Sequence, residues 1–305
     1  MPVIVARPGP WTHRDLTAGG TRFHVALAGP EAVSGAGAPL VLLLHGFPQC
    51  WWTWRSVLPA LARAGHRTAA LDLRGFGGSD RPPAGYDLAT LAHDVASVIH
   101  SLGHERAMVV GAGLGGQVAW TLPGLAPEVT AAIATVGSPH PLALRSLRSR
   151  LLSGTAMQYL SFQMRGLAER RLRSRTAMEG LLRSWAGPRT REAVARHAGY
   201  YAELMARPGA AQTALEPMRN LMLSRAEVAA LEQPVRVPVL SVQGELDPIQ
   251  PAQAYARDTH HVTGRLHQVS IRGVGHLPQE EAPAKLVSVL LPFLAEHAAG
   301  AASAR

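Results

Sequence analysis

The chain has 305 residues, of which 47% are hydrophobic and 17% are charged, and this balance excludes a largely disordered protein. Its single cysteine, Cys50, excludes a disulfide-stabilised scaffold and fits a reducing cytoplasm. The longest apolar run, at residues 286–294, is too short to span a bilayer, and no basic region precedes an apolar stretch at the N-terminus, so we expect neither a membrane span nor a secretion signal.

The positive charge is concentrated in one third of the chain. Thirty basic and 21 acidic residues give a net charge of +9. Residues 140–233 contain 15 arginines, seven glutamates and no aspartate, which accounts for +8 of this total. Such a segment would suit an anionic ligand or partner, or a membrane surface, unless its arginines only solvate helix faces. No nucleic-acid partner is expected.

Strand and helix patterns alternate along the first 139 residues. Strands are predicted at 21–28, 39–44, 67–73, 107–110 and 130–136, and helices at 88–102 and 114–122. Residues 140–233 then have a helical composition. Strand patterns return at 237–242 and 266–271, before a closing helix at 284–297. This order predicts an α/β fold with a mostly parallel, doubly wound sheet, formed by residues 1–139 and 234–305, and an inserted helical cap at 140–233.

Short motifs follow several predicted strands, where open α/β sheets build their sites. They are His45-Gly46-Phe47-Pro48, Asp72-Leu73-Arg74-Gly75-Phe76-Gly77-Gly78, Gly111-Ala112-Gly113-Leu114-Gly115-Gly116, Gly244-Glu245-Leu246-Asp247-Pro248 and Gly273-Val274-Gly275-His276. Their order and spacing resemble the α/β-hydrolase family. The aromatic segment from His45 to Arg55 is similar to the epoxide-hydrolase and haloalkane-dehalogenase branch of that family. The resemblance implies a hydrolase fold over roughly residues 20–297, with residues 140–233 in the place of the cap.

The nucleophile of the family is missing from this sequence. In the family, a strand–turn–helix elbow carries the nucleophile within a small-x-nucleophile-x-small frame. Here Gly113 occupies the nucleophile position, and Ala112 stands where epoxide hydrolases have a histidine. Glycine has no side chain that could form an ester intermediate. The standard covalent mechanism is therefore excluded at position 113.

The remaining site residues that the resemblance implies are present. Asp247 corresponds to the acid of the catalytic triad and His276 to its base. The backbone N–H groups of Phe47 and Leu114 would form the oxyanion hole, and the Phe47-Pro48 bond is expected to be cis. The substrate pocket is expected to include His45, Pro48, Trp51, Tyr159 and Met218.

The predicted cap departs from the epoxide-hydrolase pattern. That branch offers two cap tyrosines to polarise the epoxide oxygen, one of them four residues before a Phe-Gln pair. Phe162-Gln163 is present, but Gln158 holds the tyrosine position and Tyr159 is one place off. The second tyrosine is replaced by Met218. Epoxide hydrolysis is therefore not expected.

Three rival sites are weaker. Gly111-x-Gly113-x-x-Gly116 fits a dinucleotide fingerprint, but the next predicted strand ends without the acidic residue that this fingerprint needs, so no cofactor is expected. His260-His261 lacks the spacing of a metal pair, and no metal site is expected. Cys50 lies near the oxyanion loop, where we expect a buried structural thiol rather than a substitute nucleophile.

Two functions remain open. In the first, the Asp247-His276 pair activates a water directly against a small ester-like or otherwise activated substrate. In the second, the chain is a catalytically inactive pseudoenzyme that binds a ligand or partner through the same pocket and the basic cap. In both, the expected partner is a small molecule and the expected location is the cytoplasm.

Overall fold

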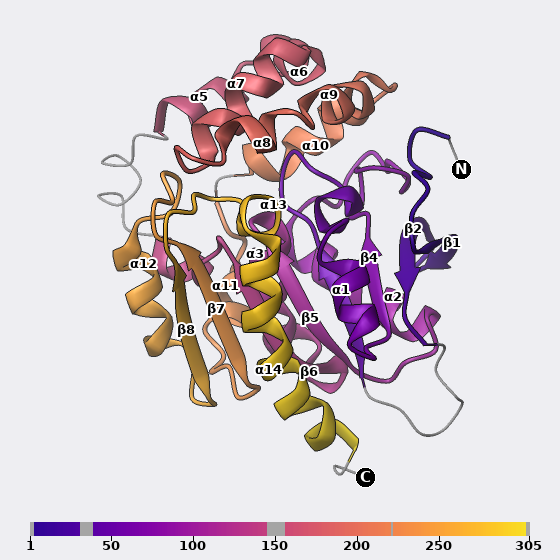
Figure 1. Ribbon diagram of the computed structural model, residues 1–305, viewed down its shortest axis with the longest axis vertical. Helices are drawn as coiled ribbons and strands as arrows, with labels where there is room; N and C mark the ends of the chain where they lie inside the picture. Colours follow the sequence, from indigo (N-terminus) through magenta and orange to yellow (C-terminus); the bar gives the residue numbers. More distant parts are fainter. Residues whose placement is uncertain (1–2, 31–38, 145–155, 221, 303–305) are drawn as a thin grey trace.

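The computed structural model describes residues 3–30, 39–144, 156–220 and 222–302 (Figure 1). Within these residues the core is an eight-stranded sheet with strand order β1-β2-β4-β3-β5-β6-β7-β8. The strands are β1 (Thr12–Ala18), β2 (Thr21–Ala28), β3 (Leu40–Leu44), β4 (Thr68–Leu71), β5 (Ala107–Ala112), β6 (Thr130–Val136), β7 (Val239–Gly244) and β8 (Leu266–Ile271). From β4 to β8 all neighbours in the sheet are parallel, whereas β2 is antiparallel to both β1 and β4. The predicted fold class is confirmed.

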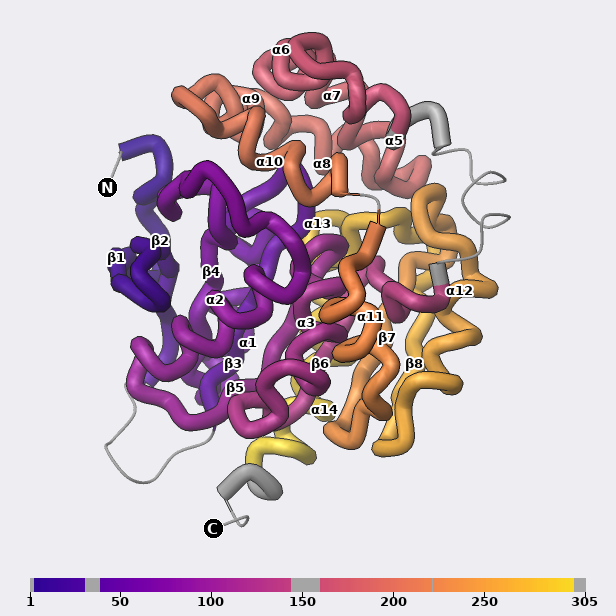
Figure 2. The backbone as a smooth tube through the Cα atoms, turned by 180° about the vertical axis from the view of Figure 1, so that it is seen from behind, coloured from indigo at the N-terminus to yellow at the C-terminus, as the bar shows by residue number. Residues whose placement is uncertain are grey.

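Helices cover both faces of the sheet, with α1 and α14 on one face and α2, α3 and α11 on the other (Figures 1 and 2). The α-helices are α1 (Leu58–Arg63), α2 (Leu88–Ser101), α3 (Leu114–Leu125), α5 (Ala156–Gln163), α6 (Leu167–Arg173), α7 (Arg175–Trp185), α8 (Arg191–Ala195), α9 (Ala198–Ala206), α10 (Ala210–Arg219), α11 (Arg225–Leu231), α12 (Ala252–Ala256), α13 (Pro278–Glu281) and α14 (Pro283–Ala302). Short 3₁₀ turns are η1 (Trp51–Trp54), η2 (Pro127–Val129), η3 (Pro141–Leu144) and η4 (Arg257–His260). In the part of the chain that is described, no helix combines the length and apolar character that crossing a bilayer requires.

The central strands are buried on both faces, as their aliphatic sequences predict. Every residue of β3 is buried, and so is every residue of β5. A parallel strand covered by helices on both sides contacts apolar groups at every position, so its sequence is continuous rather than alternating. Because β3, β5, β6 and β7 pair in parallel, their carboxyl ends lie at one edge of the sheet.

The first strand is the element that sequence patterns do not anticipate. β1 contains mostly polar residues, and only Leu16 and Ala18 of this strand are buried. It pairs with β2 along its whole length at the edge of the sheet. Backbone pairing therefore stabilises this strand where side-chain burial does little.

The segment predicted as a cap is helical where it is described. Helices α5 to α10 lie together beyond the carboxyl edge of the sheet (Figure 1). Helix α11 instead packs on α3, so closely that a Cβ at Gly124 would lie 2.1 Å from the carbonyl oxygen of Ala230. Glu227 on α11 also accepts a hydrogen bond from the backbone N–H of Leu88, at 2.7 Å. The end of the predicted insertion therefore packs with the helices that cover the sheet, and the exact cap boundaries stay a prediction.

A buried polar cluster anchors the point where the chain leaves β6. The ring of His140 stacks on His261, with ring centroids 3.8 Å apart. The backbone N–H of His140 donates to Asp258 Oδ1 at 2.8 Å, and Ser241 Oγ donates to Asp258 Oδ2 at 2.8 Å. Burial lowers the pKa of His140 to about 3, and the neighbouring His261 adds to this effect. Burial also raises the pKa of Asp258 to about 6. The imidazole of His140 is therefore uncharged at neutral pH.

We expect the His140→Phe variant to lose less stability than the wild type on acidification. The pKa of His140 is lower in the folded chain than the ordinary histidine value of 6.5, so the unfolded chain binds this proton more tightly. The stability that follows is present above pH 6.5 and is lost as the pH falls towards 3. At pH 5 the loss from this residue amounts to roughly 2 kcal/mol.

Urea unfolding at pH 7.5 and pH 5.0 measures the difference. Asp258 and the other titrating groups are present in both proteins, so their contributions cancel in the comparison. An equal loss in both proteins would contradict the uncharged, buried state of His140.

Candidate active site

Four loops meet beyond the carboxyl edge of the sheet. They follow β3, β5, β7 and β8, and they contain the motifs that begin at His45, Gly111, Gly244 and Gly273 (Figure 1). Helices α5 to α10 lie beyond them on the same side. Among the described residues, no group of three or more His, Cys, Asp or Glu side chains has an arrangement that could hold a metal ion.

The turn between β5 and α3 is a sharp elbow centred on Gly113. This residue has φ 50° and ψ −113°, a conformation that a residue with a Cβ adopts only with strain. Its N–H donates to the carbonyl of Val136 at 3.0 Å, which holds the turn against β6. Among the described residues beyond its own chain neighbours, a Cβ built on Gly113 would have within 4 Å only the Cα of Gly46, at 3.6 Å, and Nε2 of His276, at 3.8 Å. The elbow therefore has room for a small group that faces His276.

Neighbouring glycines let backbones touch rather than leave space. A Cβ at Gly111 would lie 2.1 Å from the carbonyl oxygen of Gly115, and one at Gly115 would lie 2.5 Å from the carbonyl oxygen of Leu44. The N–H of Gly115 also donates to the carbonyl of His45 at 3.1 Å. Close packing of α3 on β3 and β5 thus accounts for the glycine spacing that resembles a dinucleotide fingerprint.

Asp247 and His276 form a buried pair. His276 Nδ1 lies 2.9 Å from Asp247 Oδ2 and 3.1 Å from Oδ1. The backbone N–H groups of Ile249 and Gln250 donate to Oδ1 at 2.8 and 3.0 Å, so the carboxylate is held on both sides. The carboxylate accepts the Nδ1 proton, which leaves Nε2 of His276 free to accept one. This nitrogen is the one that faces the Gly113 elbow.

Contacts made by Trp185 and by Glu281 connect the His276 loop to the helical segment. The N–H of His276 donates to the carbonyl of Trp185 at 2.8 Å, and the indole of Trp185 lies edge-on to the imidazole, with centroids 5.6 Å apart. The carboxylate of Glu281 accepts hydrogen bonds from the backbone N–H groups of Gly187, Gly275 and Leu277 at 2.7, 2.9 and 3.0 Å. Glu281 therefore joins the loop after α7 to both sides of His276.

The adjacent Glu280 links its own loop to two other segments. Its fully buried carboxylate accepts hydrogen bonds from Gln49 and Arg55, both at 2.8 Å, and from Thr53 at 3.1 Å. The hydroxyl of Tyr201, on α9, donates to it at 2.5 Å. Burial alone would lower the pKa of Arg55, but Glu280 outweighs this and raises it. The loop after β3, helix α9 and the His276 loop are thus held by one satisfied carboxylate.

The two other predicted residues of the β3 loop have different surroundings. His45 is fully buried, donates from Nδ1 to the carbonyl of Gly46 at 2.9 Å, and accepts at Nε2 from the N–H of Leu73 at 3.1 Å. Burial lowers its pKa, so the imidazole is a neutral brace between two loops. The Phe47-Pro48 bond is cis, as predicted.

Phe47 lies under the helical segment. Its ring is edge-on to Phe162, with centroids 5.1 Å apart, and tilted against Trp185 at 6.3 Å. A Cβ at Gly113 would lie 3.6 Å from the Cα of the preceding residue, Gly46, and the N–H of Gly115 donates to the carbonyl of His45 at 3.1 Å. The backbone N–H groups of Phe47 and Leu114 therefore belong to loops that touch, and their role as oxyanion donors stays a prediction.

Trp51 has a packing role in the structure. It is fully buried, its indole N–H donates to the carbonyl of Val5 at 3.0 Å, and its ring lies edge-on to Trp11 and His13. These contacts with the N-terminal segment account for the residue, and its predicted place in the pocket has no support from them. Its backbone N–H also donates to the buried Asp72 at 2.7 Å.

The remaining predicted residues fall into two groups. Met218 is half-buried at the end of α10, where its carbonyl accepts from Gln163 Nε2 at 3.3 Å. Tyr159 lies in α5, but its side chain is outside the described residues. Cys50 is buried, and burial raises the pKa of its thiol well above the usual value, which disfavours the thiolate that a nucleophile needs.

Sequence reasoning missed Trp185, Glu280 and Glu281. The two glutamates follow the His276 motif by only four and five residues, which is a usable signal for side chains that support this loop. Trp185 has no such signal, because it reaches the site from a helix some ninety residues away in the sequence. Its contact with His276 depends on how α7 is placed over the sheet.

Comparison with known proteins gives consistent matches. The family model described as "alpha/beta hydrolase fold" matches residues 39–283. Epoxide hydrolase A of Mycobacterium tuberculosis is 31% identical over 93% of this chain and 97% of its own length. Epoxide hydrolase B of the same organism is 43% identical over 129 residues, which are 42% of this chain but only 35% of that relative.

A solved structure agrees with these sequence matches. The crystal structure of epoxide hydrolase A from Mycobacterium thermoresistibile superposes with a TM-score of 0.74 and 26% sequence identity. The match covers 93% of this chain and 98% of that structure. The similarity therefore extends over the sheet and the inserted helices together.

We expect alanine to be tolerated at Gly113 and not at Gly115. Gly113→Ala introduces a strained φ without a clash, which should lower the free energy of unfolding by about 1–3 kcal/mol. Gly115→Ala places a Cβ against the backbone oxygen of Leu44, which cannot move away without distorting β3. Its cost should exceed that of Gly113→Ala, up to loss of folding. Urea unfolding of both variants measures the order, and a Gly115→Ala variant as stable as Gly113→Ala would refute the close packing of α3 on β3.

Proposed function

Because the chain belongs to the α/β-hydrolase family and has epoxide hydrolases among its homologues, we propose that it is a hydrolase without a covalent nucleophile. The Asp247-His276 pair would activate a water directly against a small ester-like or otherwise activated substrate. One observation carries this proposal. His276 Nε2 faces an elbow whose central residue, Gly113, has no side chain, and a Cβ there would still lie 3.8 Å away from this nitrogen.

The proposed reaction is a general-base hydrolysis. A water held between His276 Nε2 and the elbow attacks the ester carbonyl and gives its proton to Nε2. The backbone N–H groups of Phe47 and Leu114 stabilise the oxyanion that forms. When the intermediate collapses, the leaving alkoxide takes the proton from His276, and the products are a carboxylic acid and an alcohol. Asp247 stabilises the imidazolium throughout.

The missing nucleophile sets the scale of this activity. Serine hydrolases that have lost their triad still accelerate hydrolysis by roughly 10³ to 10⁴ over water, through binding and the oxyanion hole. An acid–base pair in working geometry can add to that residual rate. Epoxide hydrolysis by the covalent route is not part of the proposal, since Gly113 cannot form the ester intermediate.

A second candidate is a ligand-binding protein that does no chemistry. The aromatic cover of the site favours it, because Trp185 lies edge-on against His276 and the imidazole is only 9% exposed. In this case the pocket and the basic helices would hold a small anionic ligand or contact a membrane surface. The two candidates differ in whether the wild type hydrolyses an ester at all.

The wild type should hydrolyse activated esters without forming a protein ester. We expect linear product release with no burst, because no side chain at position 113 can be acylated. The His276→Ala variant should lose at least about tenfold in kcat, as expected for a general base. Stopped-flow kinetics and intact-protein mass spectrometry measure both. A trapped acyl-protein would contradict the water mechanism, and turnover that is unchanged in His276→Ala would show that the activity does not come from this site. No turnover in the wild type would favour the ligand-binding candidate.

The Gly113→Ser variant should gain a covalent step. A serine Oγ at this position would lie within reach of His276 Nε2, so a fluorophosphonate probe should label the variant and leave the wild type unlabelled. Gly113→Ala is the control for the strain of a Cβ, and it should not be labelled. Labelling should also disappear in the Gly113→Ser/His276→Ala double variant. A folded Gly113→Ser protein that does not react would show that the pair and the elbow are out of catalytic register.

A further inference from the structure

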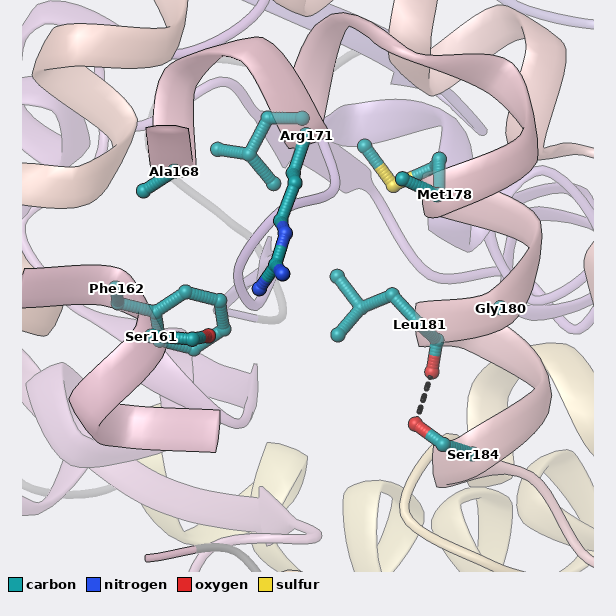
Figure 3. A pocket seen from close by; sticks show the side chains of 10 residues that line it. Ser161, Phe162, Ala168, Arg171, Met178, Gly180, Leu181 and Ser184 are labelled. Carbon is teal, nitrogen blue, oxygen red and sulfur yellow. Dashed lines mark hydrogen bonds between the residues drawn. The ribbon is translucent and has the colours of Figure 1, made fainter. Parts of the chain in front are cut away.

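A cavity lies within the helical segment, between α5, α6 and α7 (Figure 3). Its volume is about 270 Å³. The residues that line it are Ser161, Phe162, Ala168, Arg171, Leu172, Ala177, Met178, Gly180, Leu181 and Ser184. None of these belongs to the candidate active site, and all of them come from the inserted helices.

The walls of this cavity are mostly apolar, and their polar side chains are Arg171, Ser161 and Ser184. Phe162, Leu172 and Met178 are buried, and no acidic residue lines the cavity. Figure 3 shows the side chain of Arg171 reaching into the space between Phe162 and Leu181. Arg171 itself is exposed, and its guanidinium beside the apolar side chains can give charge-assisted hydrogen bonds to an anion.

Some arginines of these helices already have acidic partners. Arg175 pairs with Glu179 at 2.9 Å, and Arg183 pairs with Glu192 at 3.0 Å. Among the described residues, the guanidinium of Arg171 has neither an acidic partner nor a hydrogen bond. It is therefore available to a ligand, with a planar set of donors that matches a carboxylate.

We propose that this cavity binds a small amphipathic carboxylate, with the anion on Arg171 and the alkyl chain along Phe162 and Met178. The volume lies just below the range of about 300–1,000 Å³ that is usual for small-molecule sites, so a medium-chain fatty acid fits better than a larger lipid. Both halves of the ligand find a complementary surface: a free guanidinium at one end and apolar side chains along the walls.

The cavity adjoins the candidate active site through one side chain. Phe162 lines the cavity and also packs edge-on against Phe47, with centroids 5.1 Å apart. A bound carboxylate would therefore contact the ring that covers the predicted oxyanion loop. The binding step itself needs no catalysis, so it can be tested even if the proposed hydrolase activity fails.

Calorimetric titration with octanoate tests the proposal. Wild type should bind it saturably, and Arg171→Gln should weaken binding by about tenfold, the loss expected for a charge-assisted pair at a partly exposed site. Arg170→Gln is the matched control, because Arg170 is its exposed neighbour on α6 and does not line the cavity. That variant should bind like the wild type. Octanol, which lacks the charge, should bind more weakly and equally to wild type and Arg171→Gln.

Two further measurements separate cavity binding from surface binding. From butanoate to octanoate, affinity should rise by up to about fourfold per methylene, because each added group is buried. Ala177→Phe, which fills the cavity from α7, should abolish binding while circular dichroism shows a folded protein. Binding that is independent of chain length, that survives Ala177→Phe, or that weakens equally in Arg170→Gln and Arg171→Gln would overturn the proposal, as would the absence of saturable binding.

A membrane surface is the competing explanation for a basic, partly apolar segment. Leu160 and Met164 flank the cavity residues of α5 and are 59% and 54% exposed. Sedimentation with vesicles of anionic phospholipid distinguishes the two. If wild type binds these vesicles but not octanoate, the surface rather than the cavity is responsible, and the proposal is wrong.

Discussion

The candidate site depends on the close approach of α3 to the ends of β3 and β5. Backbone atoms meet there without side chains between them, since a Cβ at Gly111 or Gly115 would overlap a carbonyl oxygen. This contact forces the chain to turn sharply at Gly113 and directs the turn towards the loop that carries His276. Because α3 begins at that turn, its first N–H groups have no partners within the helix, and that of Gly115 donates instead to the carbonyl of His45.

Two adjacent carboxylates then hold the inserted helices over this elbow. Glu281 collects backbone N–H groups from both sides of His276 and from the loop after α7. Glu280 collects donors from the β3 loop and from Tyr201. A buried carboxylate with any of these partners missing would cost several kcal/mol, so each helps to fix the relative position of the three segments. Within the described part of the chain, neither glutamate forms a hydrogen bond with Gly113, so the geometry of the Asp247-His276 pair does not depend on a side chain at that position.

Much of the fold could be predicted from the sequence, because buried parallel strands have continuous aliphatic sequences that end at glycine-rich loops. The elbow and Asp247 could be placed for the same reason, since each follows such a strand, whereas His276 follows the partly exposed β8 and could be placed by the resemblance of its motif to the family. Strand β1 could not, because its polar residues are stabilised by backbone pairing with β2. The contacts of Trp51 and Trp185 could not be predicted either. They arise between segments far apart in the chain. A tryptophan in a sequence is equally compatible with a place in the core, in a pocket wall or in a contact that holds a loop.

Glycine at position 113 separates the geometry of the site from its chemistry. In a covalent hydrolase the nucleophile occupies a strained backbone conformation, and that strain is a cost of catalysis. Gly113 makes its sharp turn with a positive φ, which glycine adopts without that strain because it has no Cβ. The acid–base pair stays assembled because its supports are elsewhere: backbone N–H groups hold Asp247, and the carbonyl of Trp185 holds His276. A folded, well-ordered pair is therefore compatible with both catalysis and simple binding. Catalysis and simple binding can be told apart only by a reaction in which His276 Nε2 accepts a proton.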